Sequence, residues 1–157
     1  MQPGVEAHPS RWLWHREPSR LTQVCIVTDA TVEDTFEQAL STRLGNSPQV
    51  AWLHLTDPAA THGEWLASRE HAHGQAHARG SENALEQAID PLPRDSRLLL
   101  CAQDLAGLEW LGGVLGQQVF FAHYRPEANH ETQANDVVAT VEEVLRASLT
   151  AKWGDSY

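Results

Sequence analysis

Val24-Cys25-Ile26-Val27 is an unbroken apolar run, followed by Thr28-Asp29 and then by a pattern typical of a helix. Three more apolar runs occur downstream, at residues 50–55, 98–102 and 119–122, and only His54 interrupts them. An apolar run without alternation is typical of a strand that is covered on both faces, as strands of parallel sheets are. These runs therefore predict four core strands.

Helical patterns follow each of these strands and carry their own start and stop signals. Thr31 is predicted to cap a helix that Gly45 terminates, and Asp104 to cap a helix that Gly116 terminates. A last helix near 135–149 repeats apolar residues along one face. Each strand is thus predicted to alternate with a helix.

This alternation predicts an α/β fold, with a single layered domain and a mainly parallel sheet flanked by helices. The sheet has four strands, or five if the N-terminal segment adds one. We expect residues 1–20 to form an arm or an edge strand, and residues 21–157 to form the α/β domain. Within that domain, residues 68–80 are polar and rich in histidine.

The composition limits the classes of partner. The chain has 157 residues and a formal net charge of −10, whereas binding to a phosphate backbone needs a clustered cationic face. No apolar run approaches the ~18–20 residues that a membrane helix needs, and the N-terminus lacks a secretory pattern. We therefore expect a cytoplasmic protein that binds neither nucleic acid nor membrane.

Both cysteines of the chain lie inside apolar runs. Burial of Cys25 and Cys101 predicts reduced thiols with raised pKa values, which are poor nucleophiles. A disulfide between them is the alternative, because the two runs can be neighbouring strands. No nucleophile motif, glycine-rich dinucleotide turn or phosphate-binding loop occurs in the sequence.

A polar pocket is predicted where the strands end. Ligands of open parallel sheets bind beyond the carboxyl ends of the strands, at the point where the strand order reverses. Carboxylates there can hold a divalent ion, and an arginine can bind an anionic ligand. Capping of the following helices is the competing explanation for two of the aspartates, Asp57 and Asp104. The candidate pocket residues are Asp29, Thr31, Asp57, Asp104, His123 and Arg125.

A histidine cluster is the densest set of metal-ligating residues in the sequence. It consists of His71, His73 and His77. On a helix, the last two share one face at a spacing that can hold Zn²⁺ or Ni²⁺. The alternative is a polar surface segment. No cofactor is required by any motif, and a divalent metal is the one candidate.

Two tryptophans in the N-terminal segment, Trp12 and Trp14, lie at a spacing that puts both on one face of a strand. They either pack on their own domain as an edge strand or bind another chain by strand addition.

Two functions are therefore expected. The first is an accessory or regulatory protein that acts through contact with a protein partner or in a homo-oligomer. The alternative is a small α/β enzyme or ligand-binding module that uses the pocket at the strand ends, with or without a divalent metal. The sequence leaves open whether the chain is an enzyme.

Overall fold

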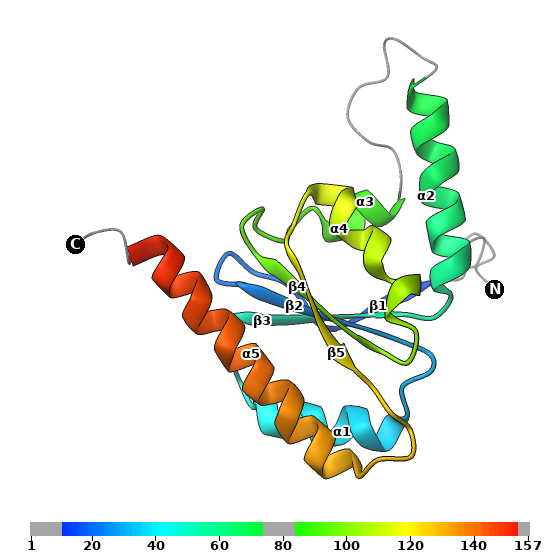
Figure 1. The fold of residues 1–157 in the computed structure, drawn as a ribbon. Helices are drawn as coiled ribbons and strands as arrows, with labels where there is room; N and C mark the ends of the chain where they lie inside the picture. The colour runs from blue at the N-terminus through cyan, green and yellow to red at the C-terminus, as the bar shows by residue number, and fades with distance from the viewer. Residues whose placement is uncertain (1–10, 74–83, 154–157) are drawn as a thin grey trace, which may run out of the picture.

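The computed structural model describes residues 11–73 and 84–153 as one α/β domain, in which helices flank a five-stranded sheet (Figure 1). The strands are β1 (Trp12–Arg16), β2 (Val24–Asp29), β3 (Val50–Leu55), β4 (Arg97–Ala102) and β5 (Val119–His123). The helices are α1 (Asp34–Leu44), α2 (Pro58–His73), α3 (Ala84–Ile89), α4 (Gly112–Leu115) and α5 (His130–Trp153). The predicted fold class is confirmed.

The strand order is β1-β3-β2-β4-β5. Strands β2 to β5 run parallel to one another, and β1 adds a fifth strand that pairs antiparallel with β3. The chain moves from β2 to β3 on one side and returns to β4 on the other. The strand order therefore reverses between β2 and β4, so the loops after these two strands lie at the switch point of the sheet.

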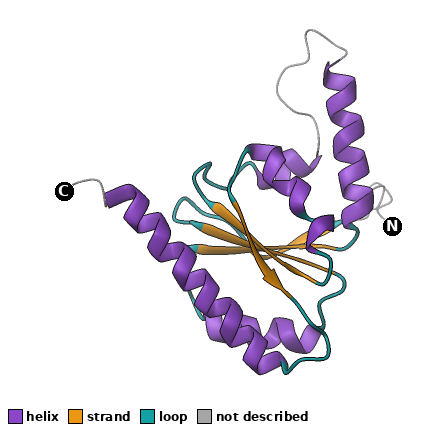
Figure 2. Ribbon diagram, in the orientation of Figure 1, coloured by secondary structure: helices purple, strands orange, loops and turns teal. Residues whose placement is uncertain are grey.

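Helices cover both faces of the sheet (Figure 2). The first core lies under α1 and α5 and includes Ile26 and Trp52. The second lies under α2, α3 and α4 and includes Leu53 and Leu100. Side chains of successive residues in a strand point to opposite faces, so an unbroken apolar run supplies both cores at once. This is why the runs do not alternate in polarity.

The predicted cap at Thr31 is wrong. Helix α1 begins three residues later, with Glu33 at its N-cap and no side-chain cap. The Asp29 carboxylate accepts hydrogen bonds from the Thr31 backbone N–H and hydroxyl, which holds both residues in the loop. The predicted stop is confirmed, because α1 ends at Gly45 with a φ of 58°.

The single helix predicted over 105–115 is also wrong. The segment forms two 3₁₀ turns, η2 (Leu105–Gly107) and η3 (Glu109–Leu111), before the short helix α4. Gly112 allows α4 to lie close to β5, since a Cβ there would be 2.6 Å from Val119 Cγ2. Gly116 ends α4 in the left-handed region, as predicted.

The two cysteines are free and buried. Burial raises the pKa of Cys25 to about 12. For Cys101, burial first and then the negative charges of Asp29 and Glu37 raise the pKa to about 12. The prediction of buried thiols without a disulfide is thus confirmed. Among the described residues, no helix combines the length and the apolar character needed to cross a membrane.

Candidate metal centre

The carboxyl edge of the sheet brings some of the predicted pocket residues together. Beyond the Asp29–Thr31 hydrogen bonds, the side-chain amide of Gln103 donates to the Thr31 carbonyl. His123 Nε2 lies 3.1 Å from the Gln103 carbonyl oxygen. These contacts link the ends of β2, β4 and β5. The polar groups at the switch point thus bind one another.

Asp57 and Asp104 act as caps. The Asp57 carboxylate accepts from the Ala60 N–H at the start of α2 and lies 3.7 Å from the Arg11 guanidinium. The Asp104 carboxylate accepts from the Gly107 N–H at the start of η2. Both side chains therefore cap a helix, which was the alternative to ligand binding that the sequence suggested for them.

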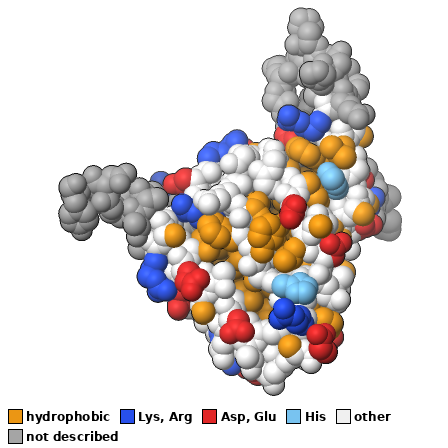
Figure 3. All heavy atoms as spheres, viewed as in Figure 1, with side chains coloured by type: hydrophobic (Ala, Val, Ile, Leu, Met, Phe, Trp, Pro, Cys, Tyr) orange, Lys and Arg blue, Asp and Glu red, His pale blue; other side chains and the backbone are white. Residues whose placement is uncertain are grey.

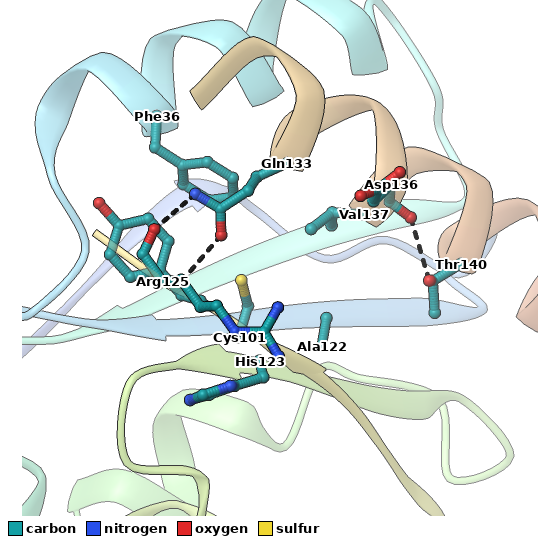
Figure 4. A pocket seen from close by; sticks show the side chains of 10 residues that line it. Phe36, Cys101, Ala122, His123, Arg125, Gln133, Asp136, Val137 and Thr140 are labelled. Carbon is teal, nitrogen blue, oxygen red and sulfur yellow. Dashed lines mark hydrogen bonds between the residues drawn. The ribbon is translucent and has the colours of Figure 1, made fainter. Parts of the chain in front are cut away.

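His123 and Arg125 line a cavity of about 140 Å³ between β5, α1 and α5 (Figure 4). Its wall includes the apolar side chains of Phe36 and Val137. The Gln133 side chain holds the Arg125 backbone, because its amide donates to the Arg125 carbonyl and its oxygen accepts from the Arg125 N–H. The cavity is smaller than the ~300–1,000 Å³ typical of sites for cofactors and drug-sized ligands.

A second polar cluster lies on the α1 face of the sheet, where sequence reasoning did not place one. It consists of His15 on β1, Glu37 on α1 and His54 on β3. His54 is opposite Leu13 in the β1–β3 pair, and the register then shifts by one residue between Trp14 and Arg16. Such a bulge redirects side chains at the edge of a sheet. The register shift therefore occurs at His15, which is itself a member of the cluster.

The three side chains converge on one point. The ligand atoms of the cluster all lie within 4.8 Å of one another. Glu37 Oε2 is 3.1 Å from His54 Nδ1 and 3.5 Å from His15 Nε2. The Glu37 and His54 side chains are 15% and 12% exposed, whereas that of His15 is 29% exposed. The cluster is therefore reached from the β1 side.

A buried hydroxyl orients the cluster. Thr28 Oγ1 lies 2.9 Å from His54 Nδ1 and 3.5 Å from Glu37 Oε2. The Trp52 indole N–H donates to this hydroxyl at 3.0 Å, so the hydroxyl proton is free to be donated to the cluster. Donation to Glu37 Oε2 is compatible with metal binding and would fix the orientation of the carboxylate, whereas donation to His54 Nδ1 would compete with a metal for that nitrogen.

The two distances from Glu37 to the histidines fit a first-row divalent metal. A tetrahedral zinc ion with bonds of about 2.0–2.1 Å holds neighbouring ligand atoms about 3.3 Å apart. Both distances to Glu37 Oε2, 3.1 and 3.5 Å, are close to this value. Two histidines and one carboxylate are also a ligand set of catalytic zinc sites, which keep the fourth position open for water or substrate.

The pKa of Glu37 predicts how the cluster depends on pH. Burial raises this pKa, but the hydrogen bond and positive charge of His54, and then those of His15, outweigh burial, so the net pKa lies below the usual 4.5. A lowered folded-state pKa means that ionised Glu37 stabilises the fold above its unfolded pKa. This contribution is lost as the pH falls through the folded pKa.

We therefore expect Glu37→Gln to lower the free energy of unfolding near pH 5–6, and the difference from wild type to shrink below about pH 4. Urea denaturation with EDTA present measures it. Glu142→Gln, at an exposed position on α5, is the control and should show no such trend. A Glu37→Gln deficit that is constant from pH 6 to pH 3 would contradict the assignment.

The sequence contained one signal for this cluster. His54 is the only polar residue in an otherwise apolar strand, which is unusual for a position that faces a core. The predicted metal ligands lie elsewhere: α2 ends at His73, whereas His77 and the side chains of His71 and His73 lie outside the described part of the structure.

The two arm tryptophans pack on their own chain. Trp12 and Trp14 are half-buried against the second core, on the face of β1 that points away from the metal-ligand cluster.

Neither a protein-family model, nor a curated protein, nor a solved structure matches this chain, so the geometry of the site is the basis for the proposed function.

Proposed function

We propose that this protein is a divalent-metal-binding α/β module whose metal centre is formed by His15, Glu37 and His54. The observation that supports it most is the convergence of three ligand atoms from three separate elements to within 4.8 Å. Each element is held independently, by strand pairing for β1 and β3 and by core packing for α1. A site of this kind is preorganised, so little ordering is needed when the ion binds.

The ligand chemistry selects the class of metal. Imidazole nitrogen with one carboxylate suits Zn²⁺, Ni²⁺, Cu²⁺ or Fe²⁺, whereas Mg²⁺ and Ca²⁺ prefer oxygen ligands only. Three protein ligands leave a position for water on the side where His15 meets solvent. Such a position is what a metal-assisted hydrolysis or a ligand-sensing role would use.

The other proposed functions have less support. At the switch point, Asp29, Thr31 and Gln103 bind one another, and Asp57 and Asp104 cap helices. A partner-binding role for Trp12 and Trp14 has to compete with the contacts that their rings make with the second core. In the metal-ligand cluster, Glu37 forms ion pairs with His15 and His54, and the three ligand atoms remain close enough together to share one ion.

Zinc should raise the melting temperature of the wild-type protein at pH 7. Free Zn²⁺ at one hundred times its Kd stabilises a native state by about 2.7 kcal/mol. In a domain of this size, each kcal/mol of stabilisation raises the melting temperature by about 2–4 °C. Calorimetric titration should give one strong site for Zn²⁺ and none for Mg²⁺. The gain should vanish near about pH 5, because protons compete with the metal for imidazole nitrogens.

Variants separate the two possible zinc sites. His15→Asn and Glu37→Gln should each abolish the strong site, whereas His73→Ala/His77→Ala should retain it. His62→Asn is the matched control, because His62 is a half-buried histidine that stacks on Trp110 at 4.5 Å, outside the metal-ligand cluster. Loss of binding in the His73→Ala/His77→Ala protein alone would assign the metal to the histidine-rich segment and contradict the proposal. Unchanged binding in both cluster variants would contradict it as well.

A further inference from the structure

The two outer strands of the sheet differ in how well their edges are protected. At β1 the register shifts by one residue at His15, and the strand has an arginine immediately before it, Arg11, and another as its last residue, Arg16. Bulges and charged side chains prevent an edge from pairing with another chain. Strand β5, Val-Phe-Phe-Ala-His, pairs with β4 in unbroken register and contains no proline, lysine, arginine or carboxylate.

In the part of the chain that the structure describes, no strand lies beside the outer edge of β5. The Leu98 N–H donates to the Gln118 carbonyl, and the Tyr124 N–H donates to the Ala102 carbonyl. In a parallel pair, every second residue points both its N–H and its C=O at the same neighbour. The even-numbered residues of this segment therefore face β4. Val119, Phe121 and His123 point their backbone groups away from the sheet.

An apolar side chain lies at the middle of this edge. Phe121 is 48% exposed, although it is the central residue of β5. In Figure 1, β5 crosses the front of the molecule between α4 and α5, and Figure 3 shows apolar side chains gathered over the same face. Apolar patches that are exposed on one face often mark sites of protein contact.

We propose that β5 pairs antiparallel with β5 of a second copy of this chain, about a two-fold axis at Phe121. The outward-facing positions are symmetric about this residue, so Phe121 faces its own copy while Val119 faces His123. No acidic side chain is placed opposite another within the paired strands. The proposal is independent of the metal centre, which lies at the other edge of the sheet.

A second copy is the occupant that the sheet itself favours. Pairing of β5 with β5 is isologous and closes after two copies, whereas pairing of β5 with β1 would continue into a filament. The closed dimer would have one continuous sheet of ten strands. Both outer strands of that sheet would be β1, the strand with the bulge and the arginines. The unprotected edge of β5 is therefore buried in the dimer, and only the protected edge of β1 remains exposed to solvent.

A cross-linking experiment tests the axis directly. Residues that face each other in a hydrogen-bonded antiparallel pair have Cα atoms about 5.5 Å apart, within reach of a short bis-maleimide. Phe121→Cys should therefore give a covalent dimer rapidly. Leu66→Cys is the matched control, since Leu66 is 44% exposed on α2. Cys25 and Cys101 should not react, because both are buried with raised pKa values.

Sedimentation equilibrium of the full chain measures the same interface without a cross-link. Each chain carries a charge of −10, so the experiment is run at about 0.15 M salt, where the Debye length is about 8 Å. We expect a dimer that Phe121→Lys weakens about 100-fold or more, because two like charges would meet at the axis. Leu66→Lys should dimerise as the wild type does.

Three results would overturn the proposal. The first is a wild-type protein that stays monomeric up to millimolar concentration. The second is a Phe121→Lys protein that dimerises as strongly as wild type while its circular dichroism shows that it is folded. The third is cross-linking of Phe121→Cys that is no faster than that of Leu66→Cys.

Discussion

Replacing Ile26 or Leu100 with alanine should lower the free energy of unfolding by about 2–5 kcal/mol. Both side chains are fully buried, on neighbouring strands. They lie in different cores, Ile26 under α1 and α5 and Leu100 under α2, α3 and α4. Each substitution removes three side-chain carbon atoms and leaves a cavity that the close-packed surroundings fill only in part.

Equilibrium denaturation in urea measures both effects. Leu21→Ala is the control, because the Leu21 side chain is 61% exposed. Its truncation should change the free energy of unfolding by less than about 0.5 kcal/mol. The two variants test the two faces of the sheet separately. A variant that unfolds at the wild-type urea concentration would show that its face of the sheet is not covered.

Removal of residues 1–18, which deletes β1, should lower the free energy of unfolding by about 3 kcal/mol or more. A fully buried large apolar side chain contributes ~1.5–3 kcal/mol, and Trp12 and Trp14 are both half-buried. The deletion also breaks the backbone pairing of β1 with β3. Trp12→Ala/Trp14→Ala should reproduce only the part of the loss that comes from the two rings, because the strand and its pairing with β3 remain.

Leu13→Ala is the control within the same strand. Leu13 lies between the two tryptophans but points to the opposite face and is largely exposed. The Leu13→Ala protein should unfold at the same urea concentration as the wild type, as measured by circular dichroism. If the double tryptophan variant keeps its stability and loses binding to another chain, the rings belong to an interface and not to the second core.

The strands could be predicted from the sequence because they are covered on both faces. Every residue of β2 is buried, so the apolar character of the run does not depend on which neighbours it has. Helix ends at Gly45 and Gly116 could be predicted for a similar reason, since both glycines adopt positive φ angles that other residues disfavour. These signals are local to the chain.

The candidate site could not be predicted in the same way. His15, Glu37 and His54 come from three elements, and no spacing between them along the chain identifies them as neighbours. Their meeting depends on the antiparallel pairing of β1 with β3 and on the register shift at His15. A shift of register by one residue moves side chains to the other face of a sheet, so the site follows from the pairing.

The carboxyl-edge residues show the same limit. The sequence placed Asp29, Thr31, His123 and Arg125 near one edge because parallel strands end together. Which of them contact one another was decided by the strand order, which puts β2 beside β4 and brings Gln103 to Thr31. Arg125 instead lines the cavity beside α5, because Gln133 holds its backbone there.

By itself, the sequence determined the α/β alternation, the buried strands and the helix stops, because burial on both faces and positive φ angles restrict residue types at each position separately. Only the tertiary structure decided the strand order, the meeting of His15, Glu37 and His54, and the exposure of Phe121 on an unprotected edge. These features arise from the pairing of segments distant in the chain. No single segment records which neighbour it will have, because the free energy of pairing depends on both partners.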